Sequence, residues 1–191
     1  MKKSLLFTML FLFCTAGVQN AFASSDIGWR SIGGDVGLVD PDNAGSTVGF
    51  GMFADLGTMA TRLHLSPQLS YWSKSEGGFG VDASVSDISL TARGKYMFAV
   101  SSGSFQPYAG AGLGLHFVTA EVTIDDQVIG GFFIPGMSTS DTQTKLGLDL
   151  GGGFVTPLSA KTDLTGDVWY TAVEDVGNFQ MTVGLAYKLG K

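Results

Sequence analysis

The stretch Phe105–Val118, FQPYAGAGLGLHFV, constrains the fold of this chain more than any other. Its residues alternate between an uninterrupted apolar row and a row of small or polar residues that includes three glycines. A strand in a soluble sheet also alternates, but the row that faces water usually carries charge. Small residues on one face suit the crowded interior of a narrow barrel whose apolar face meets lipid. The stretch therefore predicts a membrane-spanning β-strand.

The same alternation recurs in seven further segments. These are Trp29–Val39, Thr47–Leu56, Ala60–Trp72, Asp87–Phe98, Thr144–Val155, Asp163–Thr171 and Phe179–Leu189. Each is near the roughly 9–11 residues that a tilted strand needs to cross a bilayer, and eight is the smallest common barrel size. We predict an all-β fold: an eight-stranded antiparallel up-and-down transmembrane β-barrel, preceded by a cleavable signal peptide.

The pattern also predicts local features of this barrel. Pro67 cannot donate a ladder hydrogen bond, so it predicts a bulge or kink in its strand. The connections Ser73–Ser86 and Thr119–Gln143 are long and fall at one end of the barrel, whereas the connections at the other end are short. Long connections at one end and short connections at the other are typical of a barrel with both termini in the periplasm. Aromatic residues near the strand ends predict interfacial girdles: Trp29, Tyr71, Trp72, Tyr96, Phe98, Phe117, Phe154, Tyr170 and Tyr187.

The N-terminus has the features of an export signal. Lys2 and Lys3 precede the apolar run Leu5–Phe13, and Ala21-Phe22-Ala23 fits a cleavage site. We predict a signal peptide over residues 1–23 and one barrel domain over residues 24–191. The single cysteine, Cys14, lies inside the signal, so we expect no disulfide and no cysteine metal site in the mature chain.

The charge balance argues against a nucleic-acid partner. Without Lys2 and Lys3, nine basic residues stand against seventeen acidic ones, and nucleic-acid affinity depends largely on Lys and Arg. The chain after the signal contains no run of 18 apolar residues, so we expect no transmembrane helix.

Three pieces of the sequence resemble a known family. They are Pro107–Gly114, Thr144–Gly153 and Val183–Leu189, and they resemble the small outer-membrane β-barrel proteins of the porin-family, opacity-type and OmpX-like group. The last piece is similar to the assembly signal of that family, with Gly184, Tyr187 and Leu189 in its characteristic positions, although family members often end on Phe. The resemblance implies the outer membrane of a Gram-negative envelope, contact with lipopolysaccharide and with the barrel assembly machinery, and no particular activity.

Six acidic and five basic residues are expected to face the lumen. They are Asp35, Asp55, Asp87, Asp149, Asp163 and Asp167, with Arg62, Arg93, Lys95, Lys145 and Lys188. They either line an ion or solute path or form a salt-bridged plug. We favour the plug, because an eight-stranded barrel is only wide enough for its own side chains and buried charges must be paired.

The sequence gives weak indications of catalysis. His64-Leu65-Ser66 matches the His-x-Ser spacing of outer-membrane lipid A deacylases, but it faces the expected lumen and we find no acid to orient the histidine. His64 and His116 are expected to lie too far apart to share a metal. Gly49–Ala54 matches G-x-G-x-x-A but lies within a strand, where a dinucleotide site is not formed. We expect no catalytic residues, cofactor or metal.

The outer connections are acidic and contain one apolar run. Their carboxylates suit either divalent cations or a basic partner, or simply form a solvated surface, which we favour. Within the third connection, Val128, Ile129, Phe132, Phe133 and Ile134 are candidate contact residues. This run either meets a partner, folds over the barrel mouth, or extends two strands as a hairpin that turns near Asp125–Gln127.

Three functions remain open at this stage. The first, which we favour, is a monomeric structural or surface-interaction barrel with a filled lumen and an unidentified surface partner. The second is a barrel that binds or transports a small apolar solute through an opening near the third outer connection. The third is a lipid-modifying barrel enzyme.

Overall fold

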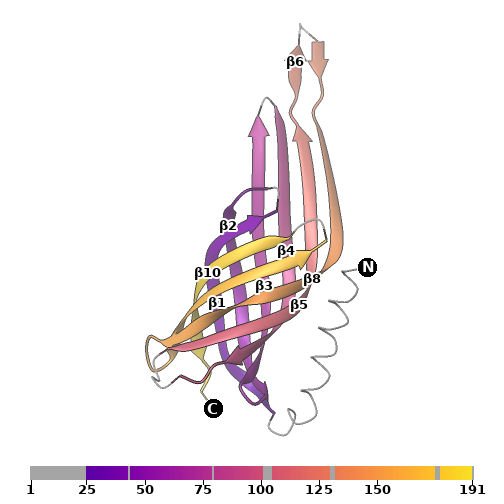
Figure 1. Cartoon of the computed structure of the whole chain (residues 1–191). Coiled ribbons are helices and arrows are strands. Elements are labelled where there is room, and N and C mark those ends of the chain that lie inside the picture. Colours follow the sequence, from indigo (N-terminus) through magenta and orange to yellow (C-terminus); the bar gives the residue numbers. More distant parts are fainter. Residues whose placement is uncertain are drawn as a thin grey trace, which may run out of the picture.

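A computed structural model describes residues 25–42, 44–78, 80–100, 105–129, 132–174 and 177–190. Eight of the strands in these ranges close into an antiparallel barrel in the order β1-β10-β9-β8-β5-β4-β3-β2 (Figure 1). The predicted barrel is therefore confirmed, while the predicted signal peptide lies outside the described residues. No helix in the described ranges is long and apolar enough to cross a membrane.

The barrel strands correspond to the eight predicted segments, and most of them are longer than expected. They are β1 (Asp26–Pro41), β2 (Thr47–Ala60), β3 (Leu63–Gly78), β4 (Val81–Met97), β5 (Gln106–Ile124), β8 (Met137–Pro157), β9 (Thr162–Val173) and β10 (Asn178–Lys188). Two short strands, β6 (Gln127–Ile129) and β7 (Phe132–Ile134), pair only with each other.

The alternation of β5 sorts its residues between membrane and lumen as the sequence predicts. Leu113 and Leu115 are 67% and 42% exposed on the outer wall, whereas His116 is 1% exposed. The inward glycines leave room for side chains of neighbouring strands. A Cβ on Gly112 would lie 2.8 Å from Arg93 Cγ, so the glycine row of β5 makes space for large groups in the lumen.

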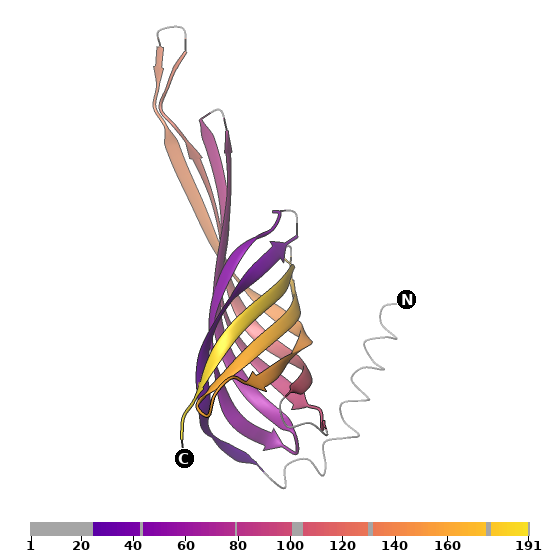
Figure 2. The ribbon, with the colours of Figure 1, turned by 90° about the vertical axis from the view of Figure 1, so that its left-hand side faces the viewer.

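The two ends of the barrel differ. One end, which we call the turn end, carries both ends of the described chain together with short connections between strands. In one of these connections, between β2 and β3, Arg62 has a positive φ of 65°. At the opposite end, which we call the hairpin end, β3 with β4 and β5 with β8 extend far beyond the other strands (Figure 2). Residues 25 and 190, where the described chain begins and ends, therefore lie on the side with short turns, as predicted.

The long connections differ from the prediction because they continue the strands. β3 and β4 stay paired from Ser73↔Ser86 to Gly78↔Val81, and β5 and β8 stay paired to Ile124↔Met137. Exposure no longer alternates there, and residues 137–144 are all exposed. Such segments lack the period-2 pattern because neither face meets lipid or a core. The hairpin extension is thus correct, but its turn near Asp125–Gln127 is wrong, because β6 begins at Gln127.

An irregularity lies beside Pro67, but the prediction of a bulge in its own strand is wrong, because the extra residue is on β2 and the pairing of Pro67 with Ala92 on β4 is unbroken. Pairing between β2 and β3 shifts register between Phe53 and Thr58, opposite the part of β3 that holds Pro67. A second shift lies between β1 and β2, at Ile27/Ser31. The wall around β2 is therefore irregular on both sides near the turn end.

Candidate functional site

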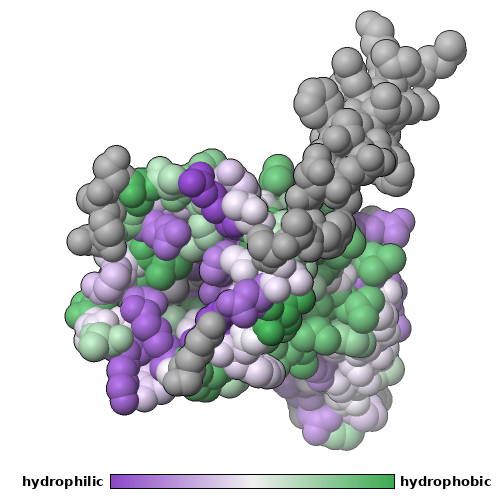
Figure 3. Space-filling model, turned by 90° about the horizontal axis from the view of Figure 1, so that it is seen from below, coloured by the Kyte–Doolittle hydropathy of each residue, from purple (hydrophilic) through white to green (hydrophobic). Residues whose placement is uncertain are grey.

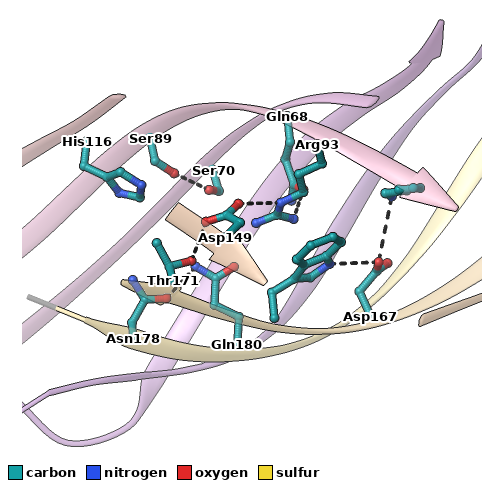
Figure 4. Close-up of polar contacts among 12 residues, drawn as sticks. Gln68, Ser70, Ser89, Arg93, His116, Asp149, Asp167, Thr171, Asn178 and Gln180 are labelled. Atoms are coloured by element: carbon teal, nitrogen blue, oxygen red, sulfur yellow. Dashed lines mark hydrogen bonds and ion pairs between the residues drawn. The ribbon is translucent and has the colours of Figure 1, made fainter. Parts of the chain in front are cut away.

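A buried ion pair lies in the middle of the lumen (Figure 4). Arg93 Nε donates to Asp149 Oδ2 at 2.6 Å, and the two side chains are 3% and 0% exposed. Gln68 accepts a further hydrogen bond from Arg93, and Thr171 donates to Asp149 at 2.8 Å. The guanidinium also lies 4.3 Å from the ring centroid of Trp169, a cation–π arrangement. These contacts join β3, β4, β8 and β9 across the lumen.

A second cluster surrounds Asp167, nearer the turn end. Tyr108 and Trp169 both donate to this carboxylate, Trp169 at 3.1 Å. Lys95 Nζ lies 3.9 Å from Asp167 and 4.9 and 5.5 Å from the ring centroids of Tyr108 and Phe53. The aromatic faces attract the ammonium group, so carboxylate and cation both have partners away from water.

A third cluster lies toward the hairpin end. His116 Nδ1 is 2.8 Å from Asp87 Oδ2, and both side chains are buried. Ser70 and Ser89 form a hydrogen bond at 2.6 Å. Side chains of three strands thus continue the polar packing along the lumen, and Figure 4 shows His116, Ser70 and Ser89 together on one side of the Arg93–Asp149 pair.

The mouth at the turn end is more open. His64 Nδ1 lies 3.0 Å from Asp55 Oδ2, and Lys188 Nζ lies 2.7 Å from Asp163 Oδ1. A cavity of about 150 Å³, lined also by Ser66, lies just inside. Hydrophilic residues are prominent when the barrel is viewed from this end (Figure 3).

The expectation that His64 lacks an orienting acid is wrong. Asp55 supplies one, because the β2–β3 turn returns the chain so that β2 and β3 lie side by side. Ser66 is 3% exposed, and no hydrogen bond among the described residues joins it to His64. A serine nucleophile needs its base within hydrogen-bond reach, so this arrangement lacks the serine–histidine contact that would activate Ser66.

The two histidines are far apart, as expected. On β4, His64 pairs with Lys95 and His116 pairs with Ser89, which places them about 20 Å apart along the strand direction. In the described ranges, no group of three His, Cys, Asp or Glu side chains is placed to hold a metal ion.

One of the predicted lumen charges is misplaced. Arg62 is exposed in the turn between β2 and β3, because β3 begins only at Leu63. The other predicted charges lie on barrel strands. Asp35 accepts a hydrogen bond from Gln68 at 3.1 Å, and Lys145 donates to the Glu174 carbonyl at 2.9 Å near the hairpin end.

Neutral side chains complete the lumen. Period-2 alternation places Gln68 and Tyr108 on the inward face, but only charged residues were predicted as members of the lumen network. Tyr108, Gln68 and Thr171 bind the charged groups directly. Trp72 was expected in an interfacial girdle, but it is 2% exposed. Alternation with Tyr71, which is 46% exposed, is the signal that could have placed Trp72 inside.

The hairpin end extends as a four-stranded antiparallel sheet, which we call the arm: residues 73–78, 81–86, 119–124 and 137–144. Continuous pairing of β3 with β4, β4 with β5 and β5 with β8 holds it together. β6 and β7 form its tip. The candidate contact residues pair there as Val128↔Phe133 and Ile129↔Phe132, with Ile134 opposite Gln127. Phe133 is 64% exposed.

The residues that resemble an assembly signal lie on or just after β10. Gly184 faces the lumen, where a Cβ would lie 2.9 Å from Thr165 Oγ1. Tyr187 is 48% exposed on the outer wall, and the Leu189 amide donates to the Arg30 carbonyl at 2.8 Å. Their role in assembly remains a prediction.

Comparison with known proteins gives one family and several similar folds. A family model described as outer membrane protein beta-barrel domain matches residues 6–188. Among solved structures, Neisserial surface protein A is 20% identical with a TM-score of 0.56, covering 83% of this chain and 96% of that protein. A search of curated proteins gives no significant match.

Two further structures show the same architecture. Ail of Yersinia pestis, in complex with the heparin analogue sucrose octasulfate, is 17% identical with a TM-score of 0.54 and covers 84% of this chain and 97% of Ail. A major outer membrane protein of Thermus thermophilus is 12% identical with a TM-score of 0.63, covering 84% of this chain and 98% of that protein. At these identities the likeness shows a shared barrel fold.

Proposed function

The chain belongs to the outer membrane protein β-barrel family, and from this premise we propose that it is a surface-interaction barrel with a closed lumen. The family places the barrel in the outer membrane of a Gram-negative envelope, in contact with lipid and lipopolysaccharide. In the proposed orientation the turn end faces the periplasm and the arm stands outside the cell. We further propose that it acts as a monomer and reaches the membrane through the barrel assembly machinery.

The observation that carries this proposal is the length and exposure of the arm. β5 and β8 contain 19 and 21 residues, against 12 and 11 in β9 and β10. Crossing the bilayer needs only about 9–11 residues, so the arm is not required to span the membrane. A regular, paired structure that projects this far supports a role in contact with other molecules.

The chemistry of the arm favours a protein partner with an apolar pocket and a neutral or basic rim. The tip is apolar in sequence and presents Phe133 at 64% exposure, and exposed aromatic groups are frequent anchors of interfaces. Acidic residues accompany the arm: Glu76, Asp82, Glu121, Asp125, Asp126 and Asp141, against Lys74. Ail was solved with a polysulfated ligand, whereas like charge disfavours such a polyanion on this arm.

The packing of the lumen supports closure. Arg93, Asp149 and Trp169 occupy the middle of the barrel at 2%, 0% and 1% exposure. An ion that passed this level would have to separate a buried pair, which leaves an uncompensated charge and costs about 3–5 kcal/mol. The polar residues therefore serve as a structural plug in the proposed function.

The tip is tested by a variant in which an Asn-Gly turn replaces residues 125–136. Ile124 and Met137 pair directly, and Asn-Gly closes a two-residue hairpin, so the barrel keeps its pairing. Intact cells that display the protein are counted on surfaces coated with serum or extracellular-matrix proteins. We expect retention to fall about tenfold in this variant, the equivalent of about 1.4 kcal/mol.

Point variants provide the matched control. Phe133→Ser should reduce retention, whereas Val122→Ser, which changes a residue 45% exposed on the shaft of the arm, should not. Equal retention of all variants and of cells without the protein would refute the tip as a contact site.

The alternative of a lipid-modifying enzyme receives a specific test because Asp55 and His64 form a hydrogen-bonded pair. We propose that this pair is structural. Lipid A from cells carrying His64→Ala or Ser66→Ala should have the same mass spectrum as lipid A from wild-type cells. A loss of an acyl-chain modification in both variants would instead establish catalysis.

A further inference from the structure

The cavity of about 150 Å³ inside the turn-end mouth is lined by residues from all eight barrel strands, so it lies on the barrel axis. It has room for several waters or for one small organic molecule. Its polar lining residues are Ser31, Asp55, His64, Ser66, Lys95, Gln106, Asp163 and Thr165, and its apolar lining residues are Phe53, Met97, Val155 and Ala186.

Two buried polar groups that line this cavity make no hydrogen bond to the described residues. The Thr165 side chain is 3% exposed, and its Oγ1 has no partner there. Lys95 lies near Asp167 and two aromatic rings, but its closest approach to that carboxylate is 3.9 Å, and no hydrogen bond joins its ammonium group to the described part of the chain. A buried polar atom without a hydrogen bond costs free energy, so both groups indicate a bound molecule.

The charged lining residues follow a defined order along the barrel axis. Asp55 and Asp163 line both the cavity and the open mouth, whereas Lys95 and Thr165 line the cavity but not the mouth. The carboxylates therefore lie toward the mouth, and the ammonium group lies deeper. A simple anion would meet the two carboxylates, and a simple cation would meet Lys95; like charges disfavour both ligands. A ligand that carries both charges matches this order.

We propose that the cavity binds one small α-amino acid in its zwitterionic form. The ligand carboxylate accepts hydrogen bonds from Lys95 and Thr165, and the ligand ammonium group donates to the carboxylates of Asp55 and Asp163. Charge-assisted hydrogen bonds are about twice as strong as neutral ones, which favours a carboxylate over a hydroxyl group at Lys95. The ligand side chain is short, because the cavity is well below the range of about 300–1,000 Å³ typical of larger ligands.

This site is independent of the proposed surface contact. It lies on the turn-end side of the buried ion pair that closes the lumen, so a ligand can enter and leave through the mouth without crossing the barrel. In the proposed orientation the mouth faces the periplasm, and the ligand is a periplasmic solute.

Calorimetric titration of the refolded mature barrel in detergent micelles tests the proposal. L-Alanine is the probe, and propionate and ethylamine are its matched controls because each lacks one of the two charged groups. We expect alanine to bind at one equivalent and at least tenfold more tightly than either control. No saturable binding of alanine would show that the cavity holds only water and would overturn the site. Binding of propionate or ethylamine as tight as that of alanine would overturn the zwitterion.

Thr165→Val removes the unpartnered hydroxyl and keeps the shape of the side chain. We expect the Kd for alanine to rise about tenfold, while the urea midpoint of the ligand-free barrel does not fall, because no hydrogen bond within the protein is lost. Thr91→Val is the matched control: Thr91 Oγ1 is also buried without a partner in the described ranges, but Thr91 does not line the cavity. Its Kd should equal that of the wild type. The same Kd in both variants would overturn the assignment of Thr165.

Lys95→Gln tests the charge at the inner end of the cavity. The variant keeps a hydrogen-bond donor but loses the ammonium group, so we expect alanine to bind no more tightly than ethylamine. An unchanged preference for alanine over ethylamine would overturn the assignment of Lys95. Heat-dependent gel mobility confirms that each variant is folded, and Thr165→Val, which leaves every ion pair intact, provides the test if Lys95→Gln does not refold.

Discussion

Neighbouring residues in the lumen are matched in size and in charge. A Cβ on Gly110 would lie 2.9 Å from Trp169 Cη2, and a Cβ on Gly112 would lie 2.8 Å from Arg93 Cγ. Because these glycines of β5 have no side chains, they leave space into which Arg93 of β4 and Trp169 of β9 extend. Arg93 then neutralises Asp149, which is fully buried.

The Arg93–Asp149 pair gives the first prediction. Arg93→Met leaves Asp149 as an unpaired buried charge, so we expect the free energy of unfolding to fall by about 3–5 kcal/mol. A double substitution, Arg93→Met with Asp149→Leu, should recover much of this loss because no charge remains buried. Urea unfolding in lipid vesicles measures both effects.

Lys188→Met is the control for the Arg93–Asp149 prediction. The Lys188 side chain lies at the rim and is 40% exposed, so this substitution should lower the free energy of unfolding by at most about 1 kcal/mol. An Arg93→Met barrel as stable as the wild type would contradict the plug.

The glycine row gives the second prediction. Gly112→Ala places a methyl group against Arg93 and the Ala92 carbonyl, 2.8 and 2.9 Å from the new Cβ, and overpacking of this kind costs about 1–3 kcal/mol. Urea unfolding compares it with Ala111→Val, which enlarges the neighbouring residue on the exposed wall. Equal stability of the two variants would show that β5 does not need glycine for packing.

At the scale of strands, β10 closes the barrel against β1 and carries the residues that resemble an assembly signal. Gly184 has a packing role, because a Cβ would meet Asp35 Cβ and Thr165 Oγ1, each at 2.9 Å. Tyr187 is 48% exposed on the outer wall, so its value for folded stability is small. Besides its place in the predicted interfacial girdle, we expect Tyr187 to be recognised during assembly.

The third prediction separates assembly from stability. Tyr187→Ala should slow insertion in cells, measured as the rise of heat-resistant compact barrel in a pulse-chase experiment. Its refolding in vitro into vesicles should match that of Val183→Ala, which truncates a residue 50% exposed on the same strand. A defect of equal size in cells and in vitro would show that Tyr187 acts through folding alone.

The strands were largely predictable from the sequence, and the reasons for the exceptions are local. The eight segments alternate because one face meets lipid and the other meets the lumen. Alternation stops in the arm, where residues 137–144 are exposed throughout, and the prediction stopped there as well. Arg62 was placed in the lumen because the pattern does not mark where a turn begins. The Asp55–His64 contact depends on how two strands lie beside a bulge, which spacing within either strand does not reveal.

The whole molecule divides into three levels with different chemistry. The turn end has a polar mouth, the middle is filled by a buried network, and the hairpin end carries the arm. Figure 1 shows how far the arm rises above the closed part of the barrel. Because the network fills the middle, the polar mouth and the arm are separated along the barrel axis, and we expect a change at one end to leave the other unaffected.

Closure of the lumen is the central claim, and bilayer conductance of the refolded mature chain tests it most directly. Heat-dependent gel mobility first confirms that the barrel has formed. We predict that the folded protein produces no channel events, because Arg93, Asp149 and Trp169 occupy the lumen with almost no exposure. Steady, discrete conductance from the folded wild-type barrel would contradict the account and establish an ion path along the lumen charges.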